Sequence, residues 1–321
     1  MNTSSFIAQV TTSSYIGWFS ELIFVLFPIL LWLTYRRGWN ISHARWPGLF
    51  SVRRFYLFSI ALLLIWLVMS SPANTLARSY LTIRSIQKIL LCMIIPPLLW
   101  NAIPFHVMLF GIGKNLRGWG IQQFVRKSKR NVWLQTITQP GIVLLVYAIS
   151  FMLWHEPSIA SWVIERPWAN QMMSCILLLT ALLFWYHVVP CGPRLHRSLP
   201  IWGIFIYLVG VEILNMLAGV TIAFAQTPIY NYYSQVHGLN SSPLYLTVMQ
   251  DQMLSGGLTW ITGSIVYIST IVLILNQFFK KEKGDPPTLS FTQPATGRTI
   301  APGLEHRVYQ ENWREIEQSQ E

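Results

Sequence analysis

Charged residues are scarce in this sequence: Lys, Arg, Asp and Glu make up 11% of its 321 residues, whereas 53% are hydrophobic. This composition excludes an ordinary soluble domain, because a soluble surface needs more charge than this. Strict alternation of apolar and polar residues, the pattern of a membrane β-barrel, is also missing. Several continuous apolar runs instead reach the roughly 20 residues that cross a bilayer as a helix. The sequence therefore predicts an all-α fold, a polytopic bundle of membrane-spanning helices.

The sequence also lacks the residue patterns of disulfide-stabilised, metal-binding and catalytic proteins. Its three cysteines, Cys92, Cys175 and Cys191, are far apart and show no CxxC spacing. We therefore expect neither a disulfide framework nor a cysteine metal site. No phosphate-binding loop, nucleophile–base pair or catalytic acid pair is recognisable. The protein is accordingly predicted not to be an enzyme.

Seven apolar runs are predicted as spans, and they divide the chain into three parts. The spans are 14–34, 55–71, 84–103, 140–154, 168–188, 199–224 and 252–279, with a surface-lying piece expected at 105–112. Residues 1–13 form an external N-terminal segment, residues 14–280 the membrane domain, and residues 281–321 a cytoplasmic tail. The tail has too little apolar content to bury a core, so we expect it to be largely disordered.

Most of the 23 Lys and Arg residues fall on one side of this arrangement, in the loops after spans one, three and five and in the tail. Because basic loops stay in the cytoplasm, the N-terminus is predicted outside and the C-terminus inside a bacterial inner (plasma) membrane. Topology then explains the net charge of +11, so the expected surroundings are lipid and not nucleic acid. Trp and Tyr residues near span ends are interpreted as interfacial anchors: Trp18, Trp46, Trp100, Trp154, Trp168, Tyr186, Tyr230, Tyr232 and Tyr233.

Two cofactors of helical membrane proteins are excluded by missing ligands. Retinal needs a Schiff-base lysine in the middle of the last span, and residues 252–279 contain none. Haem held by two histidines needs both imidazoles at one depth. On the predicted topology His155 is the one histidine at an outer span end, so it has no partner of its kind. No cofactor is therefore predicted.

The site prediction depends on polar residues inside or beside the apolar runs. Arg84, Gln87 and Lys88 share one face of the third span, since residues three and four apart are neighbours on a helix. A lone charge in hydrocarbon is costly, so we expect Arg84 and Lys88 to pair with carboxylates, first of all Asp251 and Glu21. The alternative is that each charge reaches separately toward lipid headgroups. The predicted functional cluster comprises Glu21, Arg84, Gln87, Lys88, His155, Asn170, Ser174, Glu212, Asp251 and Gln252.

Two alternative functions remain open on the residues alone. A span kinked by Pro96 and Pro97 and carrying charges also suits a transporter or an ion pathway, which a water-filled path from Glu212 to the outer cluster would favour. A copper-binding membrane protein is the second alternative. Met172, Met249 and Met253 lie at matching predicted depth and would supply soft thioether ligands for copper(I). Methionines in a bundle are, however, more often packing residues.

Four stretches, in order between residues 15 and 279, resemble the CtaG family of membrane proteins, described as cytochrome c oxidase assembly factors. They are Arg84-Ser-Ile-Gln-Lys88 with Pro96-Pro97, Trp154-His155-Glu156-Pro157, Leu182-Leu183-Phe184-Trp185, and the last group of Phe224-Ala225, Pro228-Ile229-Tyr230, Asp251-Gln252 and Gly256-Gly257-Leu258-Thr259-Trp260. The resemblance implies an assembly or accessory factor for a haem–copper cytochrome c oxidase, with oxidase subunits as partners.

The resemblance also implies histidines at positions where this chain has other residues. The family pattern places two histidines four apart on the third span, where this chain has Arg84 and Lys88. A second pair begins span five, where this chain has Asn170 and Ser174. Such pairs suit a transition metal, whereas arginine and lysine offer donors and no lone pair at neutral pH. We therefore expect an assembly factor that lacks the family's histidine metal site.

Overall fold

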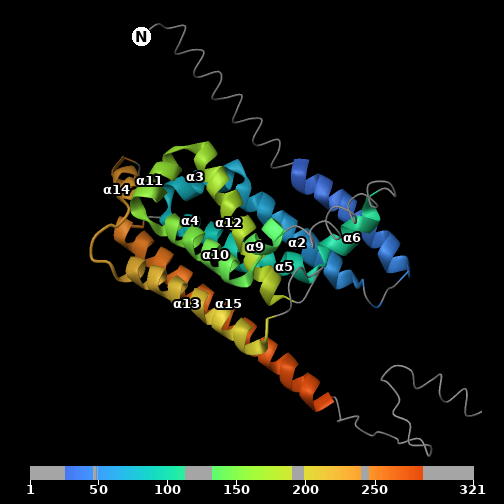
Figure 1. The fold of residues 1–321 in the computed structure, drawn as a ribbon. Helices are drawn as coiled ribbons and strands as arrows, with labels where there is room; N and C mark the ends of the chain where they lie inside the picture. The colour runs from blue at the N-terminus through green and yellow to red at the C-terminus, as the bar shows by residue number, and fades with distance from the viewer. Residues whose placement is uncertain are drawn as a thin grey trace, which may run out of the picture. The chain divides into compact units, whose positions relative to one another are not determined.

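The computed structural model describes residues 26–45, 48, 50–112, 132–189, 199–239 and 246–284. All regular secondary structure in these ranges is helical, which confirms the all-α prediction. After a helix over residues 26–45, the elements in Figure 1 are α2 (Val52–Met69), α3 (Ser71–Ser79), α4 (Leu81–Ile89), the π-helical segment η1 (Leu90–Ile94), α5 (Ile95–Asn101), α6 (Pro104–Gly111), α9 (Val132–Ile137), α10 (Pro140–His155), α11 (Pro157–Glu165), α12 (Pro167–Val188), α13 (Ile201–Phe224), α14 (Asn231–Leu239) and α15 (Val248–Gly284).

Within the described ranges, five helices are long and apolar enough to cross a membrane: α2, the continuous run Leu81–Asn101, α12, α13 and Val248–Phe279 of α15. Helices α10 and α11 add a sixth span if they are counted together, although the chain bends by 74° between them. The predicted helical bundle is thereby confirmed, with five or six candidate spans in the described ranges. The first predicted span, 14–34, begins in residues 1–25, which lie outside the described part of the chain and include Glu21.

The helix over residues 26–45 runs past the predicted end of the first span at residue 34. Arg36 and Arg37, which we expected to follow the span, lie inside this helix. The guanidinium carbon of Arg36 is 5.2 Å from the ring centroid of Trp32, one turn earlier, and this contact stabilises the continued helix. The end of an apolar run therefore does not mark the end of this helix.

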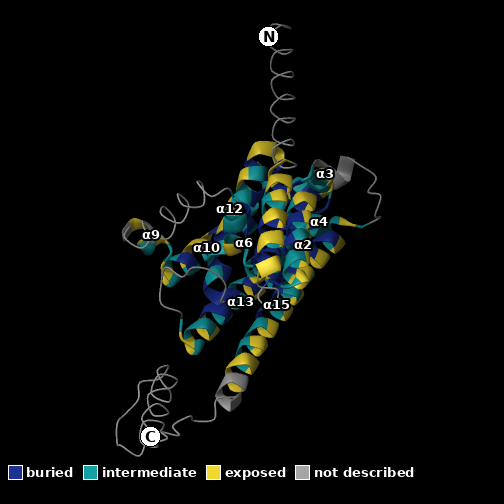
Figure 2. Cartoon of the chain, turned by 90° about the vertical axis from the view of Figure 1, so that its right-hand side faces the viewer, coloured by how far each residue is buried: buried dark blue, intermediate teal, exposed yellow. Residues whose placement is uncertain are grey.

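The outward faces of the spans are apolar, while polar side chains are buried. Exposed large apolar residues include Leu63 of α2, Leu217 of α13 and Ile261 of α15, and Figure 2 shows exposed positions along these helices. Arg84 and Asp251 are among the buried residues. A soluble protein has the opposite distribution, because water and not lipid then covers its surface.

The third predicted span changes to π-helical geometry just before two prolines. Pro96 and Pro97 have no N–H, so the Cys92 carbonyl has no backbone donor at either the α or the π spacing. The indole N–H of Trp185, on α12, donates to that carbonyl at 2.8 Å. Both Cys92 and Trp185 are buried. A neighbouring side chain therefore replaces the donor that the prolines remove.

The chain turns between α5 and α6 at Ile103, whose φ of 51° lies in the left-handed region that non-glycine residues rarely adopt. Helix α6 then follows, where we predicted a separate piece at 105–112. It packs against the helix over residues 26–45 at Gly38 and Gly111. A Cβ atom at either glycine would overlap a carbonyl oxygen of the opposite helix, so the close approach requires glycine at both positions.

Helices α13 and α15 also approach each other through glycines. A Cβ atom on Gly256 would overlap the backbone nitrogen of Ala223, and one on Gly219 would lie 2.7 Å from the Trp260 Cβ atom. Small residues at a helix contact let two backbones pack closely in lipid. We call the contact around Gly219 and Gly256 the α13–α15 seam.

Three short helices of the described chain, α3, α11 and α14, lie together at one end of the bundle (Figure 1). Helix α14 contacts both α3 and α11. A hydrophobic cluster joins them to the spans; its buried members are Leu81, Ala160, Ile164, Ile222, Tyr230 and Tyr233. We call this end of the bundle the capped end, because the short helices cover the start of α4.

Two tyrosines of the capped end are buried, so their interpretation as interfacial anchors is wrong. Tyr230 and Tyr233 each have 2% of their surface exposed. The Tyr233 hydroxyl donates to the Ala77 carbonyl at 2.7 Å, and the Tyr230 hydroxyl donates to the His155 carbonyl at 3.1 Å. Burial raises the pKa of Tyr230 to about 12. Its phenol therefore stays protonated at neutral pH and continues to donate.

The chain forms two compact units, Met1–Ile271 and Val272–Glu321. The last turns of α15 belong to the second unit. Most of the predicted tail, 281–321, lies outside the described residues.

Candidate functional site

Arg84 of α4 is enclosed at the capped end, with 3% of its surface exposed. Its Nη1 donates to Oδ1 of Asn170, on α12, at 3.1 Å. Its guanidinium carbon lies 4.9 Å from the ring centroid of Trp154, on α10, which is a cation–π distance. Three helices therefore meet at one buried cation, and neither of these partners carries a negative charge.

Asn74 of α3 connects this contact to α2 and α4. Its Oδ1 accepts from Nδ2 of Asn170 at 3.2 Å and from Nε2 of Gln87 at 3.4 Å. Its own Nδ2 donates to the Met69 carbonyl at 3.1 Å, while Gln87 donates to the Val68 carbonyl at 3.0 Å. Asn74 was not among the predicted site residues. The signal that could have identified it is a single amide side chain within Ser71–Ser79, between two apolar runs. The amides fix Asn170 so that its oxygen faces Arg84.

Lys88 lies one turn after Arg84 on α4, with 4% of its surface exposed. Within the described part of the chain it makes no hydrogen bond and no ion pair. His155 follows Trp154 at the end of α10, and the Trp154 ring lies over Arg84. We call Arg84, Lys88, Trp154, His155 and Asn170 the α4 cation cluster.

Two ring nitrogens of the α4 cation cluster are buried without a partner among the described residues: Nε1 of Trp154 and Nε2 of His155. His155 Nδ1 is 2.8 Å from the Phe151 carbonyl oxygen. Because that oxygen can only accept, the ring hydrogen lies on Nδ1 and the lone pair lies on Nε2. The cluster therefore holds the two basic side chains of Arg84 and Lys88, a free indole N–H and one imidazole lone pair.

Asp251 does not form the expected ion pair with Arg84 or Lys88. Its Oδ2 accepts from the Leu81 N–H at 2.7 Å, and its Oδ1 accepts from the Thr82 N–H at 3.0 Å. The expectation was wrong because the first N–H groups of α4 have no partner within their own helix, and the positive end of the helix dipole attracts the carboxylate. In the described ranges, the acid–base pair within 4 Å is Glu165 with Arg166, which is exposed.

Three other predicted site residues make local contacts. Gln252 accepts from the Ile229 N–H at 2.8 Å and donates to the Thr227 carbonyl at 3.3 Å, so it fixes the segment before α14. Ser174 donates to the Asn170 carbonyl at 2.8 Å, one turn earlier on α12. Glu212 accepts from Ser264 and Asn215 at the α13–α15 seam, and no hydrogen bond among the described residues joins it to the α4 cation cluster.

The described residues of the α4 cation cluster do not fit a transition metal. No group of three or more His, Cys, Asp or Glu side chains converges in the described part of the chain. The α4 cation cluster offers one imidazole lone pair beside two cations, which would repel a metal ion. Of the three candidate thioether ligands, Met172 and Met253 are more than half exposed and so lie outside the buried cluster, while Met249 is partly buried.

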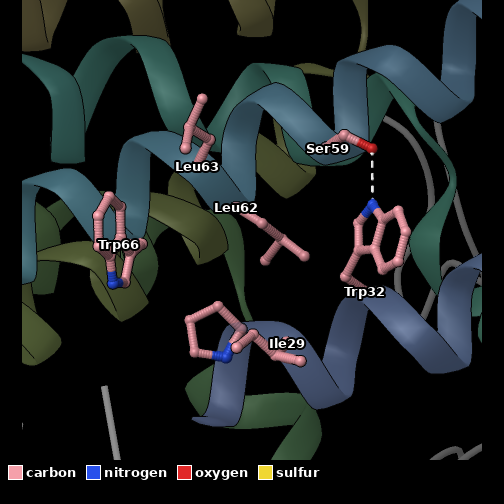
Figure 3. A pocket seen from close by; sticks show the side chains of 7 residues that line it. Ile29, Trp32, Ser59, Leu62, Leu63 and Trp66 are labelled. Atoms are coloured by element: carbon pink, nitrogen blue, oxygen red, sulfur yellow. Dashed lines mark hydrogen bonds between the residues drawn. The ribbon is translucent and has the colours of Figure 1, made fainter. Parts of the chain in front are cut away.

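A second feature, an apolar groove of about 400 Å³, lies between the helix over residues 26–45 and α2 (Figure 3). Its lining comprises Pro28, Ile29, Trp32, Ser59, Leu62, Leu63 and Trp66. The Trp32 indole donates to the Ser59 hydroxyl at 3.0 Å. None of the lining side chains is ionisable, so the groove offers neither charge nor metal ligands. The α4 cation cluster is therefore the candidate site.

The family described as cytochrome c oxidase caa3 assembly factor (CtaG) matches residues 22–281, which is most of the chain. A comparison with curated proteins and one with solved structures each gave no match.

Proposed function

The chain belongs to the family described as cytochrome c oxidase caa3 assembly factor, and from this premise we propose that it assists the assembly of a haem–copper cytochrome c oxidase. The match over residues 22–281 supports this proposal, as do the apolar spans, since the oxidase is itself a membrane complex. We propose that the protein acts through contact with oxidase subunits and not as an enzyme.

We further propose seven spans with the N-terminus outside and the C-terminus in the cytoplasm of a bacterial plasma membrane. The distribution of Lys and Arg between the loops supports this orientation. The capped end and the α4 cation cluster would then face the outer leaflet. Reporter fusions after residues 13 and 284 test the orientation: an outside reporter should be active at the first position and silent at the second.

The hydrogen bond between Arg84 and Asn170 carries the finer proposal, that the site works without a histidine-held metal. The family resemblance places histidines at positions 84, 88, 170 and 174. Positions 84 and 170 are in direct contact here, and Ser174 bonds to the Asn170 carbonyl. The four positions thus lie around one buried site in which a fixed guanidinium replaces imidazole ligands. We infer that this guanidinium maintains the capped end for contact with a partner.

Deletion of the gene tests the assembly role. We expect the deletion strain to lose most of the haem absorbance of its assembled oxidase, and expression of the unmodified chain to restore it. Glu165→Gln, at an exposed position, is the matched control and should restore the oxidase equally well. An unchanged oxidase spectrum in the deletion strain would refute the proposed function.

Copper analysis tests the absence of a histidine metal site. The unmodified protein and the double variant Arg84→His, Lys88→His should both bind well under one copper per chain after purification. Tight binding should need Asn170→His and Ser174→His as well, because two imidazoles on one helix complete only half of a tetrahedral site. Stoichiometric copper in the unmodified protein would show that the site handles metal after all.

A further inference from the structure

The α4 cation cluster contains more positive charge than its surroundings balance. Arg84 and Lys88 lie four residues apart on one helix and are both buried. No carboxylate of the described residues is within ion-pair distance of either one, because Asp251 is bound to the start of α4. Two like charges in a low-dielectric interior repel each other unless an opposite charge lies between them.

The cluster also has more hydrogen-bond donors than acceptors. The Asn170 oxygen accepts from Arg84, and the Asn74 oxygen is already shared by Asn170 and Gln87. A guanidinium carries five N–H groups and an ammonium group carries three. In the described part of the chain, Arg84 uses one of its N–H groups in a hydrogen bond, and Lys88 uses none. The buried Trp154 N–H adds a further unmatched donor.

A bound anion would correct both imbalances. We propose that the α4 cation cluster binds one small monovalent anion of the size of chloride, held by Lys88, Arg84 and the Trp154 indole N–H. The anion is small because every one of these side chains is almost completely buried. The site neither uses nor requires the assembly role, so the two proposals can fail separately.

Direct binding of ³⁶Cl⁻ to the purified full-length protein is the first test. Equilibrium dialysis in detergent, with gluconate maintaining the ionic strength, should give about one chloride per chain, displaced by bromide. No saturable uptake by the unmodified protein would overturn the proposal. Glu21, which lies outside the described residues, could instead supply the negative charge. In that case the Glu21→Gln variant would take up chloride and the unmodified protein would not, and this result would also overturn the proposal.

Substitution locates the site. Lys88→Met should abolish saturable uptake and Lys88→Arg should keep it, since the cation is retained. The control is Arg166→Gln, which removes an exposed cation beside the same end of the bundle and should leave uptake unchanged. If Arg166→Gln and Lys88→Met reduced chloride uptake equally, chloride would be attracted diffusely to the positively charged surface, and the proposal would be overturned.

Thermal unfolding provides an independent measurement. Saturating chloride should raise the unfolding temperature of the unmodified protein by several degrees relative to gluconate, because a ligand stabilises the state that binds it. The shift should vanish in Lys88→Met. If that variant does not fold, the dialysis result on the unmodified chain still decides the question.

Discussion

Besides Asp251 at the start of α4, two regions of the described bundle hold charged side chains, and they surround the charge differently. In the α4 cation cluster, Arg84 bonds to a neutral amide and Lys88 has no partner in the described ranges. At the α13–α15 seam the charge is a carboxylate, Glu212, which accepts from the Ser264 hydroxyl and the Asn215 amide. In neither place does the described chain supply an opposite charge within 4 Å.

The two regions differ in whether neutral hydrogen-bond partners satisfy the charged side chain. Glu212 is only partly buried, and its two donors come from the adjacent helix and from one turn along its own helix. In the α4 cation cluster, Arg84, Lys88, Trp154 and Asn170 are buried, the Asn170 oxygen is already occupied, and the His155 lone pair is the one acceptor left among the cluster's side chains. Neutral hydrogen bonds therefore satisfy the carboxylate, whereas the cations need something more.

The largest effect is expected from breaking the α13–α15 seam. Gly256→Val should lower the free energy of unfolding by about 3 kcal/mol or more, because the new side chain overlaps the backbone of Ala223 and must push the helices apart. Gly257→Ala is the matched control: its Cβ would meet nothing within 4 Å, so it should be neutral or slightly stabilising. Thermal unfolding in detergent measures both. Equal losses would mean that close packing does not hold the seam.

The next effect concerns the helix that carries the cations. Trp185→Phe should cost about 1–3 kcal/mol, because the buried Cys92 carbonyl loses its donor and the prolines leave no backbone replacement. Trp202→Phe, at a side chain that is 72% exposed, is the control and should change stability by less than about 0.5 kcal/mol. A stable Trp185→Phe protein would show that water or a backbone shift satisfies the carbonyl.

Hydropathy predicted the spans well because their length is set by the bilayer. The predicted spans 168–188 and 199–224 match Pro167–Val188 and Ile201–Phe224 within two residues at each end. The first predicted span differs at its end: the helix continues past residue 34 through Arg36, whose side chain packs over Trp32. A charged residue ends an apolar run without ending the helix.

The partners inside the site could not be predicted from local pattern. Helical periodicity placed Arg84 and Lys88 on one face, but the contact between Arg84 and Asn170 joins residues 86 positions apart. Asp251 was assigned to the wrong partner because charge alone favours a cation, whereas helix geometry offers two backbone donors nearby. Asn74 was missed because a short polar helix carries too few apolar residues to give a periodic signal.

Asp251→Asn separates the two roles that were considered for this carboxylate. As a cap of α4 it should cost about 1–2 kcal/mol, since one acceptor remains and the charge near the helix start is lost. A buried ion pair would cost more, about 3–5 kcal/mol. Met253→Leu, two residues further along α15 at a side chain that is 58% exposed, is the control and should change stability by less than about 0.5 kcal/mol. A loss of about 3–5 kcal/mol of stability would indicate that Asp251 does form an ion pair. The contrast between the α4 cation cluster and the α13–α15 seam would then be weaker.

The smallest effect is expected at Glu212, and it tests whether neutral partners suffice there. In Glu212→Gln the remaining oxygen still accepts from Ser264, and only the long 3.4 Å contact with Asn215 is lost. Asn215 keeps its bond to the Thr259 carbonyl at 3.3 Å. The change should therefore cost less than about 1 kcal/mol in thermal unfolding, whereas Glu212→Leu should cost more because Ser264 loses its acceptor. If Glu212→Gln proved as harmful as Glu212→Leu, the negative charge itself would be required, and a cation from outside the described residues would have to lie beside it.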